Sequence, residues 1–354
     1  MANIQEFGIG LIGLGIGQQH LLGYQRRGLQ VAAICDKDTH RLREVGDRFQ
    51  IEKRYTRIAD LIADPDVHVV DMAVQPWIRS PIVKAAAEAG KHILCQKPFS
   101  MSMRQAVEMV ETCERHNVRL MVNQNSCFVP GFLAIEPYIT SERLGEIYHL
   151  SITCNGFYTE FPERHLIPAM QVHHIGLVHK WFGDYENVYC QAHGHNRPVE
   201  AGETLSVALF KSRAGLQGLL SCNWAFLADP GRNLQHPHEE IRIQGTKGAI
   251  YGNSADMTVT LTEPEPREIK PTIAGTWFPD AFGNVMVHFL ECVSTGAQPL
   301  THGRGNLHVL QTIFALHQSA MSGEVVQIDD IALTGDYDLS PYPVHSADDL
   351  LILQ

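Results

Sequence analysis

The chain has 354 residues, which at roughly 150 residues per domain predicts two domains and a core that needs no disulfide or metal for stability. Hydrophobic residues make up 44% and charged residues 19%, an ordinary globular composition that argues against a disordered chain. Acidic residues outnumber basic ones by 39 to 28, and the net charge of -11 argues against a nucleic-acid partner, whose phosphates would be repelled.

The cysteines and apolar runs point to a compartment. None of the eight cysteines forms a Cys-x-x-Cys pair, and Cys35, Cys95 and Cys292 sit in apolar runs, which is typical of reduced, buried thiols. No apolar run approaches the ~18 residues of a membrane-spanning helix. The first residues, Met-Ala-Asn-Ile-Gln-Glu-Phe, lack a basic region and a secretory core. The sequence therefore predicts a cytoplasmic protein with no membrane partner.

Short apolar runs alternate with segments of helical spacing through the first 127 residues. The runs that predict strands are residues 7–14, 31–35, 67–74, 92–95 and 118–122. The intervening segments that predict helices include residues 18–27, 81–89 and 102–116. This alternation is typical of βαβ units, so we expect a doubly wound parallel sheet of the Rossmann type within an α/β protein.

A glycine-rich turn follows the first predicted strand and opens a helix. Gly13, Gly15 and Gly17 let the backbone approach a pyrophosphate, and the helix N-terminus offers its N–H groups. Asp36 ends the second strand, where a carboxylate accepts hydrogen bonds from ribose hydroxyls and repels a 2′-phosphate. The arrangement predicts NAD, and Lys37 beside the acid leaves NADP open. The third glycine comes one residue early, so a doubly wound fold without a dinucleotide is the alternative.

Past residue 128 the alternation changes to strands separated by turns. Strands are expected at residues 146–158, 186–195, 203–211, 215–224, 239–244 and 257–262. Helices are expected at residues 170–181, 281–293 and 305–321, before an extended C-terminal arm from about Asp329. We therefore expect two domains, a Rossmann domain over residues 1–127 and an α+β domain over 128–354 with an open, mostly antiparallel sheet.

A lysine and a proline follow the fourth predicted strand, in the run Ala89-Gly-Lys-His-Ile-Leu-Cys-Gln-Lys97-Pro98-Phe99. Ligands of open α/β sheets bind outside the carboxyl ends of the strands, and the proline fixes the turn that carries Lys97. A lysine in low-dielectric surroundings can exchange protons. An isolated Lys-Pro pair is more often a plain surface turn, so the residues around Lys97 decide whether a functional role is expected.

This run resembles the Ala-Gly-Lys-His-Val-x-Cys-Glu-Lys-Pro signature of the glucose–fructose oxidoreductase and inositol dehydrogenase family (Gfo/Idh/MocA). The resemblance extends over nearly the whole chain. It also includes the glycine turn followed by His20, Asp36, Val74-Gln-Pro76, Val122-Asn-Gln-Asn125, Ile241-Arg-Ile-Gln-Gly245-Thr-Lys-Gly248 and Ala315-Leu-His-Gln-Ser319-Ala-Met-Ser-Gly323.

The resemblance implies a cofactor, a substrate and an assembly. The cofactor is NAD or NADP, and the substrate is a sugar, polyol or related ring alcohol between the two domains. Residues 128–354 would bind the substrate and join copies into a homodimer or homotetramer through a sheet face. The implied cofactor contacts are Gly13, Gly15, Ile16, Gly17, Asp36, Gln75, Pro76, Gln96, Lys97 and Asn125.

Two residues match the family's acid/base and oxyanion groups. Lys97 matches its lysine, and His173, in Gln171-Val-His-His-Ile-Gly176, matches its histidine. In the dehydrogenase so implied, hydride passes from a secondary alcohol carbon to the nicotinamide, His173 takes the hydroxyl proton, and Lys97 stabilises the developing alkoxide. Arg164 and His174 are candidate substrate contacts, because polar side chains entering this helix would face the cleft.

Several positions depart from the family pattern. Ala169 stands four residues before His173, where the family often has an aspartate. The other departures are Gln75, Ser80, Gln96 and Cys127, which replace a threonine, a histidine, the glutamate of Glu-Lys-Pro and an arginine. They leave two alternatives open: a non-catalytic NAD-binding sensor or regulatory protein, and redox-assisted elimination or glycoside cleavage.

Several histidines, His165, His173, His174 and His179, lie near the helix expected at residues 170–181, and a zinc site is an alternative to catalysis. His174 and His179 do not share a helical face as residues four apart would, and no cysteine or carboxylate nearby completes a ligand set. The sequence therefore predicts no metal.

Overall fold

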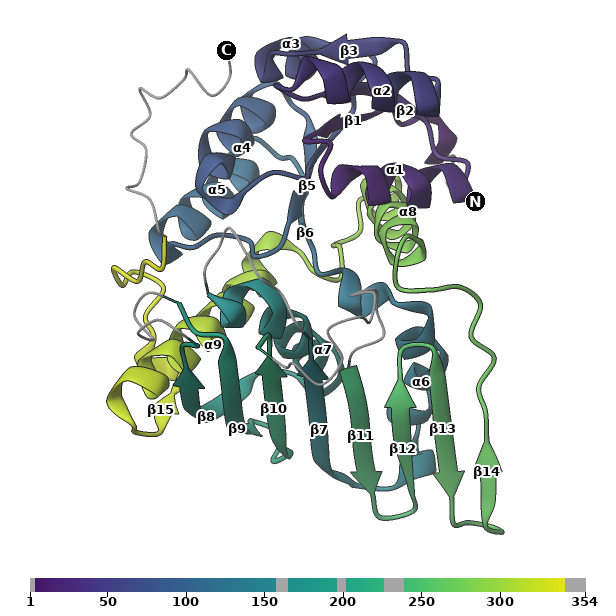
Figure 1. Cartoon of the computed structure of the whole chain (residues 1–354), viewed down its shortest axis with the longest axis vertical. Helices are drawn as coiled ribbons and strands as arrows, with labels where there is room; N and C mark the ends of the chain where they lie inside the picture. Colours follow the sequence, from purple (N-terminus) through teal and green to yellow (C-terminus); the bar gives the residue numbers. More distant parts are fainter. Residues whose placement is uncertain (1–3, 157–164, 196–201, 226–238, 341–354) are drawn as a thin grey trace. The chain divides into compact units, whose positions relative to one another are not determined.

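The computed structural model describes most of the chain (Figure 1). The described residues are 4–156, 165–195, 202–225 and 239–340. They fall into two compact units, each built around one sheet. The first contains the described residues of Met1–Gln124, Phe278–Leu307 and Leu333–Gln354, and the second those of Asn125–Trp277 and His308–Ala332.

The first unit contains a six-stranded sheet in the order β3-β2-β1-β4-β5-β6. All of its strand pairs are parallel, so the carboxyl ends of the strands gather at one edge. The strand order reverses beside β1, which makes the sheet doubly wound and confirms the predicted Rossmann architecture. The strands are β1 Ile9–Ile12, β2 Val31–Cys35, β3 Lys53–Tyr55, β4 Val69–Met72, β5 His92–Gln96 and β6 Leu120–Asn123.

Helices connect these strands and complete the unit. They are α1 Gly17–Arg26, α2 Thr39–Phe49, α3 Ile58–Ala63, α4 Arg79–Glu88, α5 Met103–Arg115 and α8 Asp280–Thr295. Helix α8 lies far along the chain yet packs on α1 at two glycines: a Cβ on Gly23 would meet Gly283 N at 2.7 Å. Residues 278–307 therefore fold with the first unit, although the sequence assigned them to the domain that follows residue 127.

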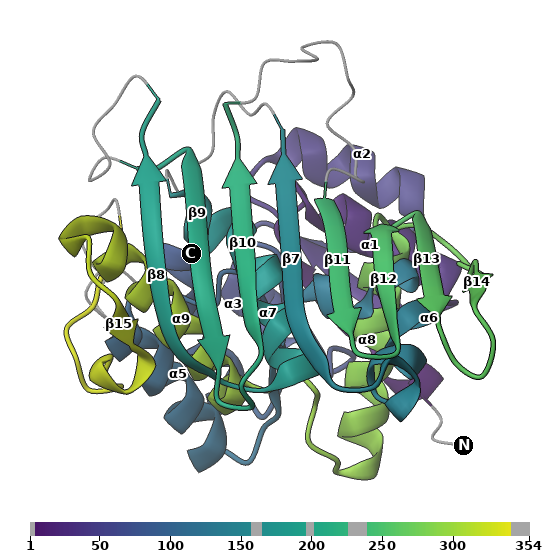
Figure 2. The ribbon, with the colours of Figure 1, turned by 90° about the horizontal axis from the view of Figure 1, so that it is seen from below.

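The second unit contains a nine-stranded sheet in the order β14-β13-β12-β11-β7-β10-β9-β8-β15, seen face-on in Figure 2. Its pairs are antiparallel except β7 with β10, which confirms a mostly antiparallel sheet. The strands are β7 Ile147–Asn155, β8 Tyr185–His193, β9 Leu205–Ser212, β10 Gln217–Asn223, β11 Glu239–Gly245, β12 Gly248–Asn253, β13 Asp256–Leu261, β14 Arg267–Ile269 and β15 Val326–Gln327.

Three helices cover one face of this sheet. They are α6 Pro130–Ile139, α7 Val172–Phe182 and α9 Gly303–Ser322, and a π-helical turn, Ile167–Gln171, leads into α7 (Figure 2). Strand residues alternate between this covered face and the other face, so Leu150, Ile152 and Cys154 of β7 are buried beneath the helices. In the described part of the chain, none of the helices is long and apolar enough to cross a bilayer.

Candidate active site

The glycine turn leaves room for a ligand at the carboxyl edge of the first sheet. Gly13 has φ +90°, a conformation that L side chains rarely adopt, and a Cβ there would meet Ala73 O at 2.7 Å. A Cβ on Gly15 would meet nothing within 4 Å, so the space above the turn is open. Ile16 and Gly17 then lead into α1. The turn fits the pyrophosphate of a dinucleotide, because N–H groups at the start of α1 can reach into that space.

Asp36 is fixed beside this turn by backbone donors. Leu14 N donates to its Oδ2 at 2.8 Å and Asp38 N to its Oδ1 at 2.9 Å, and the residue is only 7% exposed. Arg41 Nη1 lies 3.3 Å from the same Oδ2. A carboxylate held in this way can accept hydrogen bonds from ribose hydroxyls without reorganising, as the sequence analysis expected for an NAD site.

Buried amides stand at the end of β6, next to the strand that carries Lys97. Gln96 of β5 pairs in register with Asn123, and Gln124 follows. The side-chain amides of Asn123 and Gln124 are buried and have no hydrogen-bond partner among the described residues. A buried amide without a partner is costly, so these groups fit a polar ligand such as the nicotinamide end of the cofactor. The run Val122-Asn-Gln-Asn125 is part of the family resemblance, but only Asn125 was predicted from it as a cofactor contact.

A buried hydrogen-bond chain leads from Gln96 into the sheet. Lys97 N donates to Gln96 Oε1 at 2.7 Å, which leaves the amide nitrogen of Gln96 to donate to His20 Nε2 at 3.0 Å. The proton of His20 must then be on Nδ1, 2.8 Å from Asp71 Oδ2, which also accepts from the Tyr24 hydroxyl at 2.6 Å. Burial and the Asp71 carboxylate raise the pKa of Tyr24 well above its ordinary value.

Arg79 of α4 holds the turn that carries Lys97, and the sequence analysis did not identify it. Its guanidinium is 1% exposed and donates to Val74 O at 2.6 and 2.9 Å and to Gln96 O at 2.5 Å. It also donates to the carbonyls of Pro98 and, at 3.4 Å, Lys97. The Lys97-Pro98 peptide is cis. One side chain thus joins the ends of β4 and β5, where Gln75, Pro76 and Lys97 lie.

His173 lies in the second unit, on α7. It is 4% exposed, its ring stands edge-on to Trp277 with centroids 5.6 Å apart, and its backbone carbonyl accepts from Ser126 Oγ at 3.0 Å. Asn125 belongs to the same surroundings, because its Oδ1 accepts from the indole N–H of Trp277 at 3.2 Å. Ala169 is buried in the π-helical turn. Arg164, the other predicted substrate contact, lies outside the described residues.

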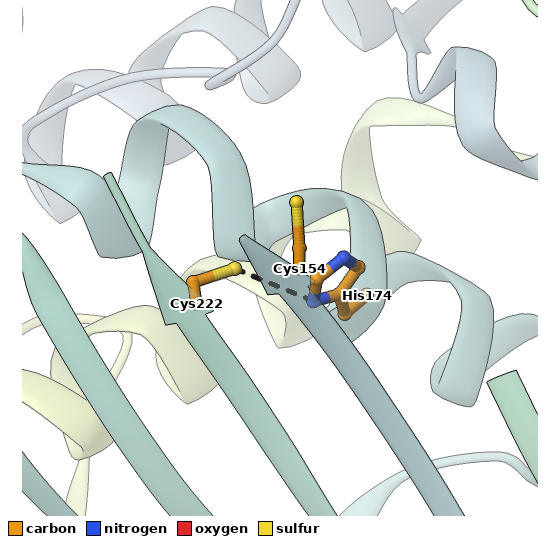
Figure 3. A group of neighbouring side chains, drawn as sticks. All are labelled: Cys154, His174 and Cys222. Atoms are coloured by element: carbon orange, nitrogen blue, oxygen red, sulfur yellow. Dashed lines mark hydrogen bonds between the residues drawn. The ribbon is translucent and has the colours of Figure 1, made fainter. Parts of the chain in front are cut away.

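His174 points to the sheet rather than pairing with its neighbour His173. Its Nδ1 is 3.6 Å from Cys222 Sγ of β10, and Cys154 of β7 completes a group of three metal-binding side chains (Figure 3). Hydrogen bonding from Cys222, followed by His174, lowers the pKa of Cys154 below its ordinary value, while burial raises that of Cys222. Sequence patterns did not predict a cysteine near these histidines, because Cys154 and Cys222 are distant in sequence and only the strand register brings them together.

A second group of possible metal ligands contains His165, Glu203 and His317. His165 Nδ1 is 2.6 Å from Glu203 Oε2, and Ile167 N donates to Glu203 Oε1 at 2.9 Å. Both oxygens of the Glu203 carboxylate therefore already have hydrogen-bond partners. We interpret this group as a histidine–carboxylate pair that holds the start of the π-helical turn.

Two models of known protein families match this chain. Residues 7–124 match the model described as "Oxidoreductase family, NAD-binding Rossmann fold", and residues 132–251 match the GFO/IDH/MocA C-terminal domain. The chain belongs to the GFO/IDH/MocA oxidoreductase family. It is therefore an NAD-dependent oxidoreductase, and the glycine turn, Asp36 and the buried amides are the parts of this chain that fit the cofactor.

Several relatives are named as dehydrogenases of sugars or polyols. The D-apiose dehydrogenase of Paraburkholderia graminis is 26% identical over 93% of this chain and 91% of its own length. The myo-inositol 2-dehydrogenase of Thermotoga maritima is 24% identical over 91% of this chain and 99% of its own. A solved oxidoreductase from Agrobacterium radiobacter, in complex with NAD+, L-tartaric acid and magnesium, has a TM-score of 0.82 at 25% identity and covers 92% of this chain and 100% of its own.

Proposed function

We propose that this protein is a dehydrogenase that oxidises a secondary alcohol of a sugar or polyol to a ketone. NAD, when bound, accepts the hydride at C4 of its nicotinamide. His173 takes the hydroxyl proton as general base, and the Lys97 ammonium donates a hydrogen bond to the same oxygen as negative charge develops there. Arg164 is proposed as a further substrate contact.

The observation that carries this proposal is how Lys97 is held. Its backbone is fixed by Gln96 from one side and by Arg79 from the other, and both partners are buried. A cationic side chain on a turn of fixed geometry can stabilise a developing alkoxide without reorganising during the reaction. Such preorganised charges lower the activation free energy the most. A plain surface turn would not need a buried arginine to join two strand ends.

The first test is cofactor binding by the purified, cofactor-free protein. Paired calorimetric titrations should show NADH binding and weaker NADPH binding. Asp36→Ala should raise the Kd for NADH by roughly 10-fold or more, because it removes charge-assisted hydrogen bonds. Asp38→Asn is the matched control, since it keeps the cap of α2 and should leave the Kd unchanged. Failure of the wild type to bind either nucleotide contradicts the proposal.

The second test is turnover on a panel of sugars and ring polyols that includes D-apiose and myo-inositol. Reduction of NAD with one member supports the dehydrogenase. Tight NADH binding without turnover on any member favours the sensor, which Ala169 in place of an acid would suit. Product formation without net reduction of NAD favours redox-assisted elimination or glycoside cleavage.

The assembly and its location are part of the same proposal. Leu209 of β9 is 56% exposed on the outer sheet face, and it pairs in register with Tyr189 of β8 and Leu219 of β10. This apolar row suits a contact between copies, so we propose a homodimer or homotetramer, which light scattering on wild type and Leu209→Lys would test.

None of the eight cysteines, all in described parts of the chain, forms a disulfide, which suits the cytoplasm.

A further inference from the structure

Three side chains with soft metal-binding atoms meet inside the second unit, apart from the residues assigned to the cofactor and the base. One potential ligand atom from each of Cys154, His174 and Cys222 lies within 4.8 Å of the other two (Figure 3). In a tetrahedral zinc site, a sulfur and a nitrogen ligand stand about 3.6 Å apart. Cys222 Sγ and His174 Nδ1 are 3.6 Å apart, so an ion fits between them with little movement of either side chain.

The fold itself produces this convergence. Cys154 and Cys222 face each other in register across the parallel pair β7 with β10, and both point to the face that the helices cover. Helix α7 lies over that face and supplies His174. Two neighbouring strands and one helix thus contribute one ligand each, so a bound ion would tie α7 to the middle of the sheet.

Burial and charge favour a cation at this place. The exposed fractions of Cys154, His174 and Cys222 are 3%, 2% and 0%. Glu239 of β11 pairs in register with Cys154 on its other side and is also buried, so a carboxylate adds negative charge to the same corner. Two thiolates cancel the charge of a divalent ion, and the Glu239 carboxylate favours a cation further, so the ion costs less to bury here than it would alone. Thiolate and imidazole ligands select zinc over magnesium or calcium.

We propose that Cys154, His174 and Cys222 bind a zinc ion, with the fourth coordination position left to a water molecule. The metal site stands whether or not the proposed dehydrogenase function holds. One consequence does rest on that function: His174 directly follows His173, so the ion would position the helix that carries the proposed base. In this role His174 is a metal ligand rather than a substrate contact.

A disulfide is the competing fate of the two cysteines. Neighbouring strands place paired Cα atoms about 4.8 Å apart, within the range that a disulfide allows. A disulfide, however, gives no role to the histidine whose Nδ1 faces Cys222. Metal binding uses all three side chains, and the two fates are separated by mass and by metal content.

The test is metal content of the full-length chain, with no affinity tag, equilibrated with zinc alone and freed of loosely bound ions. We expect about one zinc per wild-type chain, in keeping with one ligand set. Cys154→Ser, Cys222→Ser and His174→Gln should each weaken zinc binding by more than about 10-fold, which is the lower range for loss of even an indirect partner of a metal. Cys190→Ser removes a buried thiol from β8 of the same sheet and should leave zinc binding unchanged.

Cobalt supplies a second readout that does not depend on how well the variants fold. Co²⁺ added to metal-free wild-type protein should give the near-ultraviolet charge-transfer band of thiolate ligation, and zinc should displace it. The proposal is overturned by a wild-type chain that holds no zinc, by zinc content equal in wild type and His174→Gln, or by a Cys154–Cys222 disulfide in protein kept under reducing conditions. NADH binding is followed in parallel, so that loss of the metal and loss of the cofactor site remain distinguishable.

Discussion

The two units place their functional side chains in different ways. In the first unit, the glycine turn, Asp36 and Lys97 follow strands β1, β2 and β5 of one parallel sheet, so they lie at the same edge of that sheet whatever the lengths of the helices between. In the second unit, Cys154 and Cys222 meet only because β7 and β10 pair in one particular register. Sites at the edge of a parallel sheet can be found from sequence order, whereas sites on the face of a sheet depend on which strands pair and in which register.

The largest effect should come from the proposed base in the second unit. His173→Asn should lower kcat by about 10²- to 10⁴-fold, the usual contribution of a general base, with little change in the Kd for NADH. His179→Asn is the matched control on the same helix, where the ring pairs with Asp184 instead. Steady-state kinetics on the best substrate of the panel provide the measurement. If His173→Asn lowered kcat by less than about 3-fold, the loss would be far smaller than a general base contributes, and His173 would have no such role in the mechanism.

The corresponding change in the first unit should be somewhat milder. Lys97→Met should lower kcat by about 10²- to 10³-fold, because one donor to the developing alkoxide is lost. NADH binding should be nearly intact, as calorimetry can show. Lys84→Met, an exposed lysine on α4, should behave as wild type. Loss of NADH binding with Lys97→Met would instead indicate that the lysine has a structural role in the cofactor site.

A substitution of Arg79 tests whether the strand ends alone can position Lys97, or whether the Arg79 side chain is also needed. Arg79→Met leaves the buried carbonyls of Val74, Gln96 and Pro98 without their donor, and we expect the free energy of unfolding to fall by about 2–3 kcal/mol. Turnover should fall with it, and Arg79→Lys should restore part of both. Urea denaturation with parallel kinetics measures the two effects. Unchanged turnover in a destabilised variant would separate Arg79 from the positioning of Lys97.

The smallest effect is expected deep in the hydrogen-bond chain of the first unit. Tyr24→Phe removes one donor to Asp71 but leaves His20, so the free energy of unfolding should fall by about 1 kcal/mol. Turnover should be unaffected. Tyr251→Phe, on an exposed part of β12, should change stability by less than about 0.5 kcal/mol. A large drop in turnover with Tyr24→Phe would show that the chain reaches the reacting centre.

The sequence predicted the first sheet well, because strand–helix alternation and the glycine turn are local patterns. It missed Arg79, since a single arginine after a strand carries no motif, and its role is visible only when four carbonyls surround it. It missed Cys154 and Cys222 as partners of His174 because pairing register is a property of the folded sheet. The strands Lys53–Tyr55 and Val326–Gln327 were too short to give a periodic signal.

The return of α8 to α1 has a consequence for how the protein is made. Arg26 on α1 and Asp280 on α8 form an ion pair although they stand 254 residues apart in the chain. During translation the N-terminal sheet emerges long before the helix that packs on α1, so the surface of α1 around Gly23 stays uncovered until α8 has been made. A gene fragment that stops near residue 127 would produce a chain with that surface of α1 exposed. Swapping cofactor units between relatives would therefore require residues 278–307 to be grafted together with the N-terminal segment.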